Sequence, residues 1–248
     1  MQAVITGASS GLGAEFARQL DAMGYETVLV ARRREQLETL RHTLTNKSEV
    51  VCMDLAVPEN AQKLFERFPE ADILINNAGF GLFGAFRESD PAVLERMIAT
   101  NVTAATVLLR LYGEAFTARG SGYILNTASS AAFMAGPYFA LYYASKSYLL
   151  RLSQALACEW KPLGVTVSAL CPGSVATEFN LRAGTTSSTK PISAQKCVQY
   201  ALKKLFAGKA IIIPTAKMRA AFVMSKLMPE SWLTAFSCRV QTKRMKEK

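Results

Sequence analysis

The stretch "TGASSGLG", residues Thr6 to Gly13, decides the fold through what stands on each side of it. It follows a short apolar run, AVIT (3–6), and opens a helical pattern at about 11–23, so the order predicts a strand, a loop and a helix. Glycines in such a loop let the backbone turn sharply and approach a pyrophosphate, which the free N–H groups at the helix start can bind. The stretch therefore predicts a dinucleotide-binding loop made by Gly7, Ser9, Ser10, Gly11, Leu12 and Gly13.

The same alternation continues along the chain. Apolar runs that predict strands buried on both faces lie at 3–6, 27–30, 50–53, 72–76, 123–127, 165–170 and 210–214. Helical patterns lie between them at about 11–23, 35–45, 58–68, 91–118, 138–159 and 193–207. Alternating strands and helices predict an α/β fold, a doubly wound parallel sheet of the Rossmann type. We expect about seven strands with helices on both faces, in a single domain over residues 1–248.

The end of the second strand bears on the choice of cofactor. Sites for NAD usually have an acidic residue there, which binds the ribose 2′-hydroxyl. This chain instead has VLVARRRE (28–35), in which Ala31 is followed by Arg32 and Arg33. No carboxylate would repel a 2′-phosphate, and the guanidinium of Arg32 can bind one through its fork of N–H donors. The pattern favours NADP(H) over NAD.

The glycine loop also matches a serine-hydrolase pattern. GASSG (7–11) fits G-x-S-x-G, which would present Ser9 as a nucleophile on a strand–turn–helix elbow. That chemistry needs a histidine base and an acid between the serine and the histidine. The sequence has one histidine, His42, in the second helical pattern with no strand-end acid before it. The hydrolase is therefore only a distant alternative.

A second motif predicts a side chain that donates and accepts a proton. In LYYASKSYLL (141–150), Tyr142 and Lys146 are four residues apart and face the same side of a helix, where the ammonium would favour the phenolate form of the tyrosine. Such a phenol can exchange a proton with a carbonyl oxygen. Tyr143 lies three residues from Lys146 and is also within reach, and both Ser129 and Ser130 precede a tyrosine by thirteen residues. The residues alone therefore do not decide between Tyr142 with Ser129 and Tyr143 with Ser130.

Several motifs in order make the chain resemble an NADP-preferring short-chain dehydrogenase/reductase over about residues 1–215. They are TGASSGLG (6–13), Asp54 with Leu55, NNAG (76–79), Asn101, Ser129, Tyr142 with Lys146, and Pro172 with Gly173 followed by Thr177. The stretch 124–149 resembles members called ketoacyl or steroid reductases. The family's Tyr-x-x-x-Lys spacing selects Tyr142 as the proton donor and Ser129 as its partner at the substrate carbonyl.

The resemblance also implies the other site residues. Asn101 would hold a proton-relay water beside Lys146, and Lys146 would also bind the nicotinamide ribose; the alternative for Asn101 is a helix-bending amide satisfied locally. Asp54 and Leu55 would contact adenine. Cofactor contacts are further implied for Asn77, Ala78, Gly79, Pro172, Gly173, Val175 and Thr177. Family members commonly pair through their long helices, so a homodimer or homotetramer is expected.

The substrate side is implied by position and by apolar residues. Residues 178–192 stand where the family has a mobile substrate lid, and GTTSST (184–189) is typical of a flexible loop. Phe133, Met134, Phe139, Phe179 and Leu181 suggest an apolar pocket for a ketoacyl, steroid-like or other ketone. We expect a small-molecule carbonyl or alcohol substrate. A dinucleotide-binding sensor with little turnover is the alternative, which an intact Ser129, Tyr142 and Lys146 set argues against.

The charge and the cysteines set further limits. Residues 1–189 hold 16 Lys and Arg against 17 Asp and Glu, whereas residues 190–248 hold 13 against 2, so the net charge of +10 comes from the end of the chain. We expect residues 215–248 to form a basic helical extension that covers the pocket or a dimer interface, or that contacts an anionic membrane surface. No nucleic-acid motif accompanies this charge. Five scattered cysteines predict neither disulfides nor a metal site, and residues 1–6 do not resemble a signal peptide, so a cytoplasmic location is expected.

Overall fold

The sheet is the centre of the fold. A computed structural model describes residues 1–185 and 190–246. Seven strands form one sheet in the order β3-β2-β1-β4-β5-β6-β9, and every neighbouring pair is parallel. The predicted α/β fold and the seven strands are confirmed. The strands are β1 Gln2–Thr6, β2 Glu26–Ala31, β3 Ser48–Cys52, β4 Ile73–Asn76, β5 Gly122–Thr127, β6 Val165–Leu170 and β9 Ile211–Ile212.

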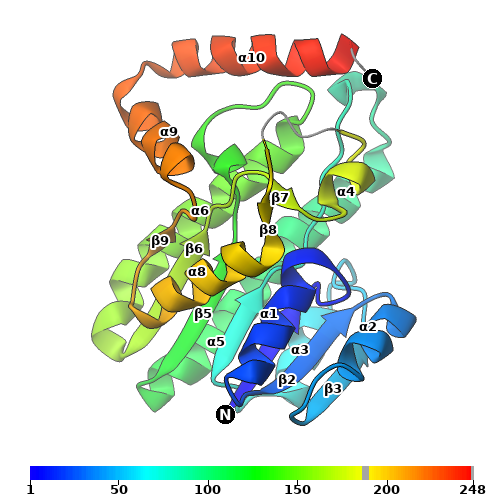
Figure 1. Ribbon diagram of the computed structural model, residues 1–248, viewed down its shortest axis with the longest axis vertical. Coiled ribbons are helices and arrows are strands. Elements are labelled where there is room, and N and C mark those ends of the chain that lie inside the picture. The colour runs from blue at the N-terminus through cyan, green and yellow to red at the C-terminus, as the bar shows by residue number, and fades with distance from the viewer. Residues whose placement is uncertain (186–189, 247–248) are drawn as a thin grey trace.

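Helices cover both faces of the sheet, because successive strand residues point to opposite sides. In β1, Ala3 and Ile5 pack into the core under α1 (Gly11–Ala22), α2 (Arg34–Arg41) and α8 (Ala194–Phe206). Val4 points the other way, into the core under α3 (Asn60–Arg67), α5 (Ala105–Arg119) and α6 (Ala140–Trp160). Figure 1 shows α1 and α8 on the near face and α5 behind the sheet. The uninterrupted apolar runs are thus explained by burial on both faces.

The strand order creates the crevice that a ligand can use. After β1 the chain adds β2 and β3 on one side, and it then crosses over to place β4, β5 and β6 on the other side of β1. The loops that leave β1 and β4 therefore diverge from each other at the carboxyl edge of the sheet. This topological switch point lies where the glycine loop stands.

Two predicted helices differ from the structure. The pattern at 35–45 predicts a longer helix than α2, which ends at Arg41, since Asp21 accepts hydrogen bonds from the backbone N–H groups of Thr45 and Asn46 and holds them in a loop. The pattern at 91–118 forms α4 (Pro91–Ile98) and α5, joined by a π-helical segment Ala99–Ala104. This run, Pro91–Arg119, is long and apolar enough to span a membrane by composition, but α5 packs against α3 and the sheet.

Two segments lie over the carboxyl edge of the sheet, the loop around α7 and the two C-terminal helices (Figure 1). Two short parallel strands, β7 (Val175–Ala176) and β8 (Ile192–Ser193), close the base of a loop that contains α7 (Phe179–Arg182). Beyond β9, α9 (Ala216–Leu227) rises from the sheet and α10 (Glu230–Lys246) crosses the top of the molecule (Figure 1). Part of the expected lid and most of GTTSST, residues 186–189, lie outside the described residues.

Candidate active site

The glycine loop has the geometry of a phosphate-binding turn. Gly7 has a φ of +68°, in the left-handed region that favours glycine. A Cβ on Gly13 would stand 2.2 Å from the carbonyl oxygen of Gly7, so the loop can close onto α1 only with glycine there. The first turn of α1 carries no acidic residue, and the side chain of its N-cap residue, Ser10, makes no capping hydrogen bond. The helix start therefore offers free N–H groups to an anion.

A threonine joins the glycine loop to the loop after β4. The hydroxyl oxygen of Thr6 accepts hydrogen bonds from the backbone N–H groups of Asn77 and Ala78, both at 2.9 Å. The side-chain amide of Asn77 donates to the carbonyl oxygen of Thr6 at 3.1 Å. Thr6 thus fixes the two sides of the switch point. The family motif contains this residue, but the motif alone did not assign it a positioning function.

Arginine side chains stand at the end of β2, as the sequence predicts. Arg33 donates from Nη2 to the hydroxyls of Ser9 at 2.9 Å and Ser10 at 3.0 Å, while Arg32 is exposed and lines the same cavity. Glu178 forms an ion pair with Arg33 at 3.8 Å and another with Arg182. The ion pair between Glu178 and Arg33 joins the loop of α7 to the segment after β2, and Arg33 in turn contacts the glycine loop. The sequence did not indicate this contact between distant segments.

Asp54 stands at the end of β3 and is held in its charged form. Burial opposes ionisation, but hydrogen bonds from the backbone N–H of Ala56 and from Arg96 outweigh it and lower the pKa of Asp54. Leu55 beside it is buried. Both residues line the cavity next to the glycine loop, at the position that the resemblance implies for adenine.

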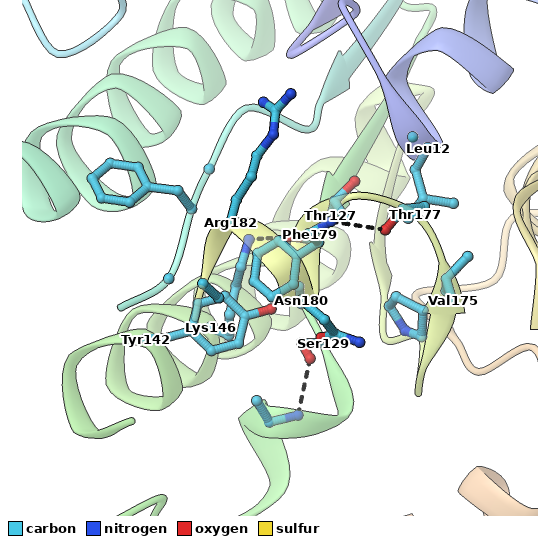
Figure 2. Close-up of a pocket in the computed structure, with 18 of the residues that line it drawn as sticks. Leu12, Thr127, Ser129, Tyr142, Lys146, Val175, Thr177, Phe179, Asn180 and Arg182 are labelled. Carbon is cyan, nitrogen blue, oxygen red and sulfur yellow. Dashed lines mark hydrogen bonds between the residues drawn. The ribbon is translucent and has the colours of Figure 1, made fainter. Parts of the chain in front are cut away.

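The two tyrosines point to different partners. The side chain of Ser129 lies near the hydroxyl of Tyr142 (Figure 2) and acts to lower the pKa of that hydroxyl, although burial outweighs it. The hydroxyl of Tyr143 instead accepts a hydrogen bond from Nε2 of Gln241 in α10, at 2.9 Å. In Figure 2, Tyr142 and Lys146 lie beside one another, with Ser129 close to the hydroxyl end of the tyrosine. The geometry therefore pairs Tyr142 with Ser129, the pair that the family spacing favoured.

Lys146 is buried between the tyrosine and the end of β5. Its Nζ atom donates to the carbonyl oxygen of Thr127 at 2.6 Å and stands 5.8 Å from the ring centroid of Tyr142. Burial lowers the pKa of Lys146 to about 8, although the nearby Cys171 thiol works in the opposite direction. The lysine side chain therefore loses its proton far more easily than a lysine in water.

The predicted acidification of the tyrosine is wrong for this structure. Burial raises the pKa of Tyr142 to about 12, and the nearby Ser129 side chain offsets only part of that effect. The ring of Tyr142 stacks on Phe139 with centroids 4.6 Å apart and also contacts Phe179. An apolar surrounding disfavours the phenolate more than a cation almost 6 Å from the ring favours it. At neutral pH the phenol keeps its proton.

Asn101 lies in the π-helical segment and is buried. Its Oδ1 accepts from the backbone N–H of Phe80 at 3.0 Å, and its Nδ2 donates to the carbonyl oxygen of Phe80 at 2.8 Å and to Ser145 at 3.2 Å. A Cβ on Gly79 would approach Asn101 Oδ1 at 3.0 Å and Lys146 Nζ at 3.3 Å, so these side chains meet at one point. π-Helical turns occur frequently at functional sites. The amide is satisfied by protein groups and also lies beside the lysine.

One cavity of about 900 Å³ collects most of the predicted site. Gly13 and Asn101 do not line it: Gly13 packs behind the glycine loop, and Asn101 lies behind Gly79. The predicted residues that do line it are Gly7, Ser9, Ser10, Gly11, Leu12, Arg32, Arg33, Asp54, Leu55, Asn77, Ala78, Gly79, Ser129, Tyr142, Lys146, Pro172, Gly173, Val175 and Thr177.

The substrate end of the cavity is apolar, as predicted, but one of the predicted pocket residues is not part of it. Phe133, Met134, Phe139 and Phe179 line it, but Leu181 does not and is 83% exposed, because α7 turns that side chain outward. Residues of the C-terminal helices complete the wall, a contribution that the sequence left open among three alternatives. They are Lys217, Met218 and Ala221 of α9, and Phe236, Ser237, Val240, Gln241 and Arg244 of α10.

The described parts of the chain form neither of two other kinds of site, a serine-hydrolase triad and a metal centre. The hydroxyl of Ser9 accepts from Arg33, whereas His42 follows the far end of α2, about 12 Å along the helix from Arg34. Ser9 therefore has no histidine base beside it. Within residues 1–185 and 190–246, no group of three or more His, Cys, Asp or Glu side chains could hold a metal ion.

Comparisons with known proteins agree with this geometry. A family model for short chain dehydrogenases matches residues 1–187. Galactitol 2-dehydrogenase (L-tagatose-forming) of Cereibacter sphaeroides is 36% identical over 188 residues, which cover 73% of each chain. A short-chain dehydrogenase from Sphingobium yanoikuyae in complex with NADPH is 32% identical with a TM-score of 0.84, over 90% of this chain and 91% of that one.

A more distant structure has the same fold. A short-chain dehydrogenase/reductase from Burkholderia phymatum in complex with NAD is 23% identical, with a TM-score of 0.78 over 89% of this chain and 91% of that one. The family model covers well over half of the sequence, and the serine, tyrosine and lysine stand together beside the glycine loop. The chain therefore belongs to the short-chain dehydrogenase/reductase family of oxidoreductases.

Proposed function

We propose that the protein is an NADP(H)-dependent oxidoreductase that interconverts an apolar ketone or aldehyde and the corresponding alcohol. The observation that carries this proposal is the pair of Tyr142 and Ser129, which stand together on the wall of a cavity lined at one end by the glycine loop and at the other by apolar side chains (Figure 2). A binding module has no need of a proton donor at that place, so the pair favours turnover over the sensor alternative.

Different side chains would carry out different steps of this reaction. The dinucleotide, when bound along the glycine loop, supplies or accepts the hydride. Tyr142 keeps its proton at neutral pH, since burial raises its pKa to about 12, and it can donate that proton to a carbonyl oxygen that Ser129 also contacts. Lys146, whose pKa burial lowers to about 8, stands beside the tyrosine and can take part in returning the proton. The apolar wall keeps water away from the reacting carbon.

The residues at the end of β2 support a preference for NADP(H). The guanidinium of Arg33 bridges the hydroxyls of Ser9 and Ser10, and Arg32 lies next to it with an exposed side chain. A 2′-phosphate at this place would meet two arginines and two hydroxyls. The carboxylates that line the cavity, Asp54 and Glu178, are both paired with arginines. Neighbours of known structure hold NADPH in one case and NAD in another, so the support comes from these side chains.

Enzyme kinetics test the cofactor preference. We expect Arg33→Ala to raise the KM for NADPH about 10- to 100-fold, as expected for lost hydrogen bonds between charged groups, and to change the KM for NADH much less. Arg34→Ala is the matched control, because Arg34 pairs with Glu38 on the surface and does not line the cavity. A wild-type enzyme that uses NADH as well as NADPH would contradict the preference.

A substrate screen tests the activity. NADPH oxidation is measured with neutral ketones of graded size and polarity, and we expect turnover that favours bulky apolar ketones. Tight NADPH binding without turnover of any ketone or alcohol would support the sensor instead. Covalent labelling of Ser9 by a serine-directed fluorophosphonate would support the hydrolase.

A further inference from the structure

A polar cluster interrupts the apolar substrate end of the cavity. It consists of Tyr143 from α6 with Gln241 and Arg244 from α10, and all three line the cavity. Nε2 of Gln241 donates to the Tyr143 hydroxyl at 2.9 Å, and Nη1 of Arg244 donates to Oε1 of Gln241 at 3.3 Å. Gln241 is only 2% exposed. The cluster is a set of oriented side chains inside the site.

Arg244 brings a positive charge that no carboxylate neutralises within the described residues. Its Nε atom is buried and has no hydrogen-bond partner there. The carboxylates that line the cavity are paired with Arg96 and with Arg33 and Arg182, beside the glycine loop and α7. Lys217 of α9 adds a second cation to the cavity wall. A guanidinium that lines a cavity without a paired carboxylate favours an anionic ligand at that place.

The hydrogen-bond directions define the chemistry of that ligand. Tyr143 accepts from Gln241, which leaves its own O–H free to donate, and the guanidinium-bearing side chain of Arg244 lines the cavity beside Gln241. These groups are donors, and a planar guanidinium matches a carboxylate especially well. Phe236 and Val240 of the same helix, α10, also line the cavity. The surroundings therefore fit a molecule with an apolar body and an anionic end.

We propose that Arg244, with Tyr143 and Gln241, binds a carboxylate of the substrate, so that the preferred substrates are apolar ketones or alcohols with a carboxylate at the end remote from the reacting carbon. This inference rests on the proposed function for the position of the reacting carbon. The anion site itself is a property of α6 and α10.

Paired substrates test the proposal. Phenyl keto acids of increasing chain length are compared with their methyl esters in NADPH-dependent reduction by wild type, Arg244→Gln and Arg239→Gln. Arg239 is the matched control because it is exposed on α10 and does not line the cavity. We expect Arg244→Gln to lower kcat/KM about 10- to 100-fold for the best keto acid, mainly through KM, and to leave its ester within about twofold. Arg239→Gln leaves both unchanged.

Calorimetric titration of the same keto acids into the full chain with NADPH gives a readout without turnover. We expect weaker binding of the acid, but not of the ester, to Arg244→Gln. Equal effects on acid and ester, or equal binding of the acid to wild type and variant, would overturn the anion site. Turnover of neutral ketones with no acid preference would sink this inference and leave the proposed function intact. Binding of the acid through Arg244 without reduction of any ketone would support the anion site and contradict the proposed function.

Discussion

One residue position separates Tyr142 from Tyr143, and the two side chains have different environments. The sequence placed both within helical reach of Lys146, and the family spacing selected Tyr142. What distinguishes them in space is Ser129 on one side and Gln241 on the other, the latter 98 residues away from Tyr143 in the chain. Helical spacing predicts which residues share a face, but not which distant segment contacts each of them.

Phenylalanine substitutions distinguish the two tyrosines. We expect Tyr142→Phe to lower kcat for a neutral ketone about 100- to 10,000-fold, the usual contribution of a positioned general acid, while NADPH binding stays close to that of wild type. Tyr143→Phe is the matched control and should keep most of the activity toward the same neutral ketone. Retained turnover in Tyr142→Phe would contradict the assignment.

The buried lysine predicts a pH dependence of stability. Its pKa is lowered from 10.5 to about 8, so between these values the unfolded chain binds the proton that the folded chain has released. The free energy of unfolding should therefore rise with pH across that window. Relative to Lys146→Met, we expect wild type to gain on the order of 1 kcal/mol per pH unit between about pH 8 and 10.

Urea unfolding of both proteins at several pH values measures this slope, and titrations that both proteins share cancel in the difference. The raised pKa of Tyr142 acts in the opposite direction but only above pH 10, where its stabilising contribution begins to be lost. Parallel curves for the two proteins would show that the folded lysine titrates normally.

At the scale of single elements, strands were easier to predict than the details of helices. Runs such as VTVSAL (165–170) are mostly apolar or small because both faces of β6 are buried, and this signal is local. The π-helical segment at Ala99–Ala104 gave no periodic signal, since six residues are too few to shift the pattern of a long helix. Asn101 was the one visible sign, as a polar residue in an apolar run.

We expect the π-helical segment to depend on the hydrogen bonds between Asn101 and the backbone of Phe80. Asn101→Ala removes both and leaves a partly buried N–H and a partly buried C=O of Phe80 without these partners, which should lower the free energy of unfolding by about 2 to 4 kcal/mol. Thr103→Ala, at an exposed position of the same segment, is the control. The measurement is urea unfolding with NADPH oxidation in parallel; equal stability of the two variants would argue against this dependence.

At the scale of the whole molecule, the sequence predicted the sheet but not the position of the C-terminal helices. An apolar helix face indicates burial without identifying the surface that buries it, so the pocket, an interface and a membrane all remained open. The inner face of α10 buries Leu233, Ser237 and Gln241 over the cavity. The helices α9 and α10 also expose five large apolar side chains, Val223, Met224, Leu227, Trp232 and Phe236, of which only Phe236 lines the cavity.

Contact with a membrane surface stays a prediction, supported by this exposed apolar surface and the basic residues around it. We expect the full chain to float with anionic vesicles at low salt and Trp232→Glu to float less, since it removes an apolar anchor and adds a negative charge. Neutral vesicles are the control. Equal flotation of both proteins, or a concentration-dependent mass that shows pairing through this surface, would contradict the prediction.

Cofactor binding should be visible in the stability of the whole chain, because a ligand that binds only the folded state stabilises it by mass action. At about 100 times its Kd, NADPH should add about 2.7 kcal/mol to the free energy of unfolding, and NADH at the same concentration should add less. The difference between the two dinucleotides is the 2′-phosphate, so Arg33→Ala should remove most of it, whereas Arg34→Ala should preserve it. Thermal unfolding with each dinucleotide measures these shifts without any substrate. Equal stabilisation by NADPH and NADH in wild type would mean that the arginines after β2 do not select the cofactor, even if the enzyme reduces ketones.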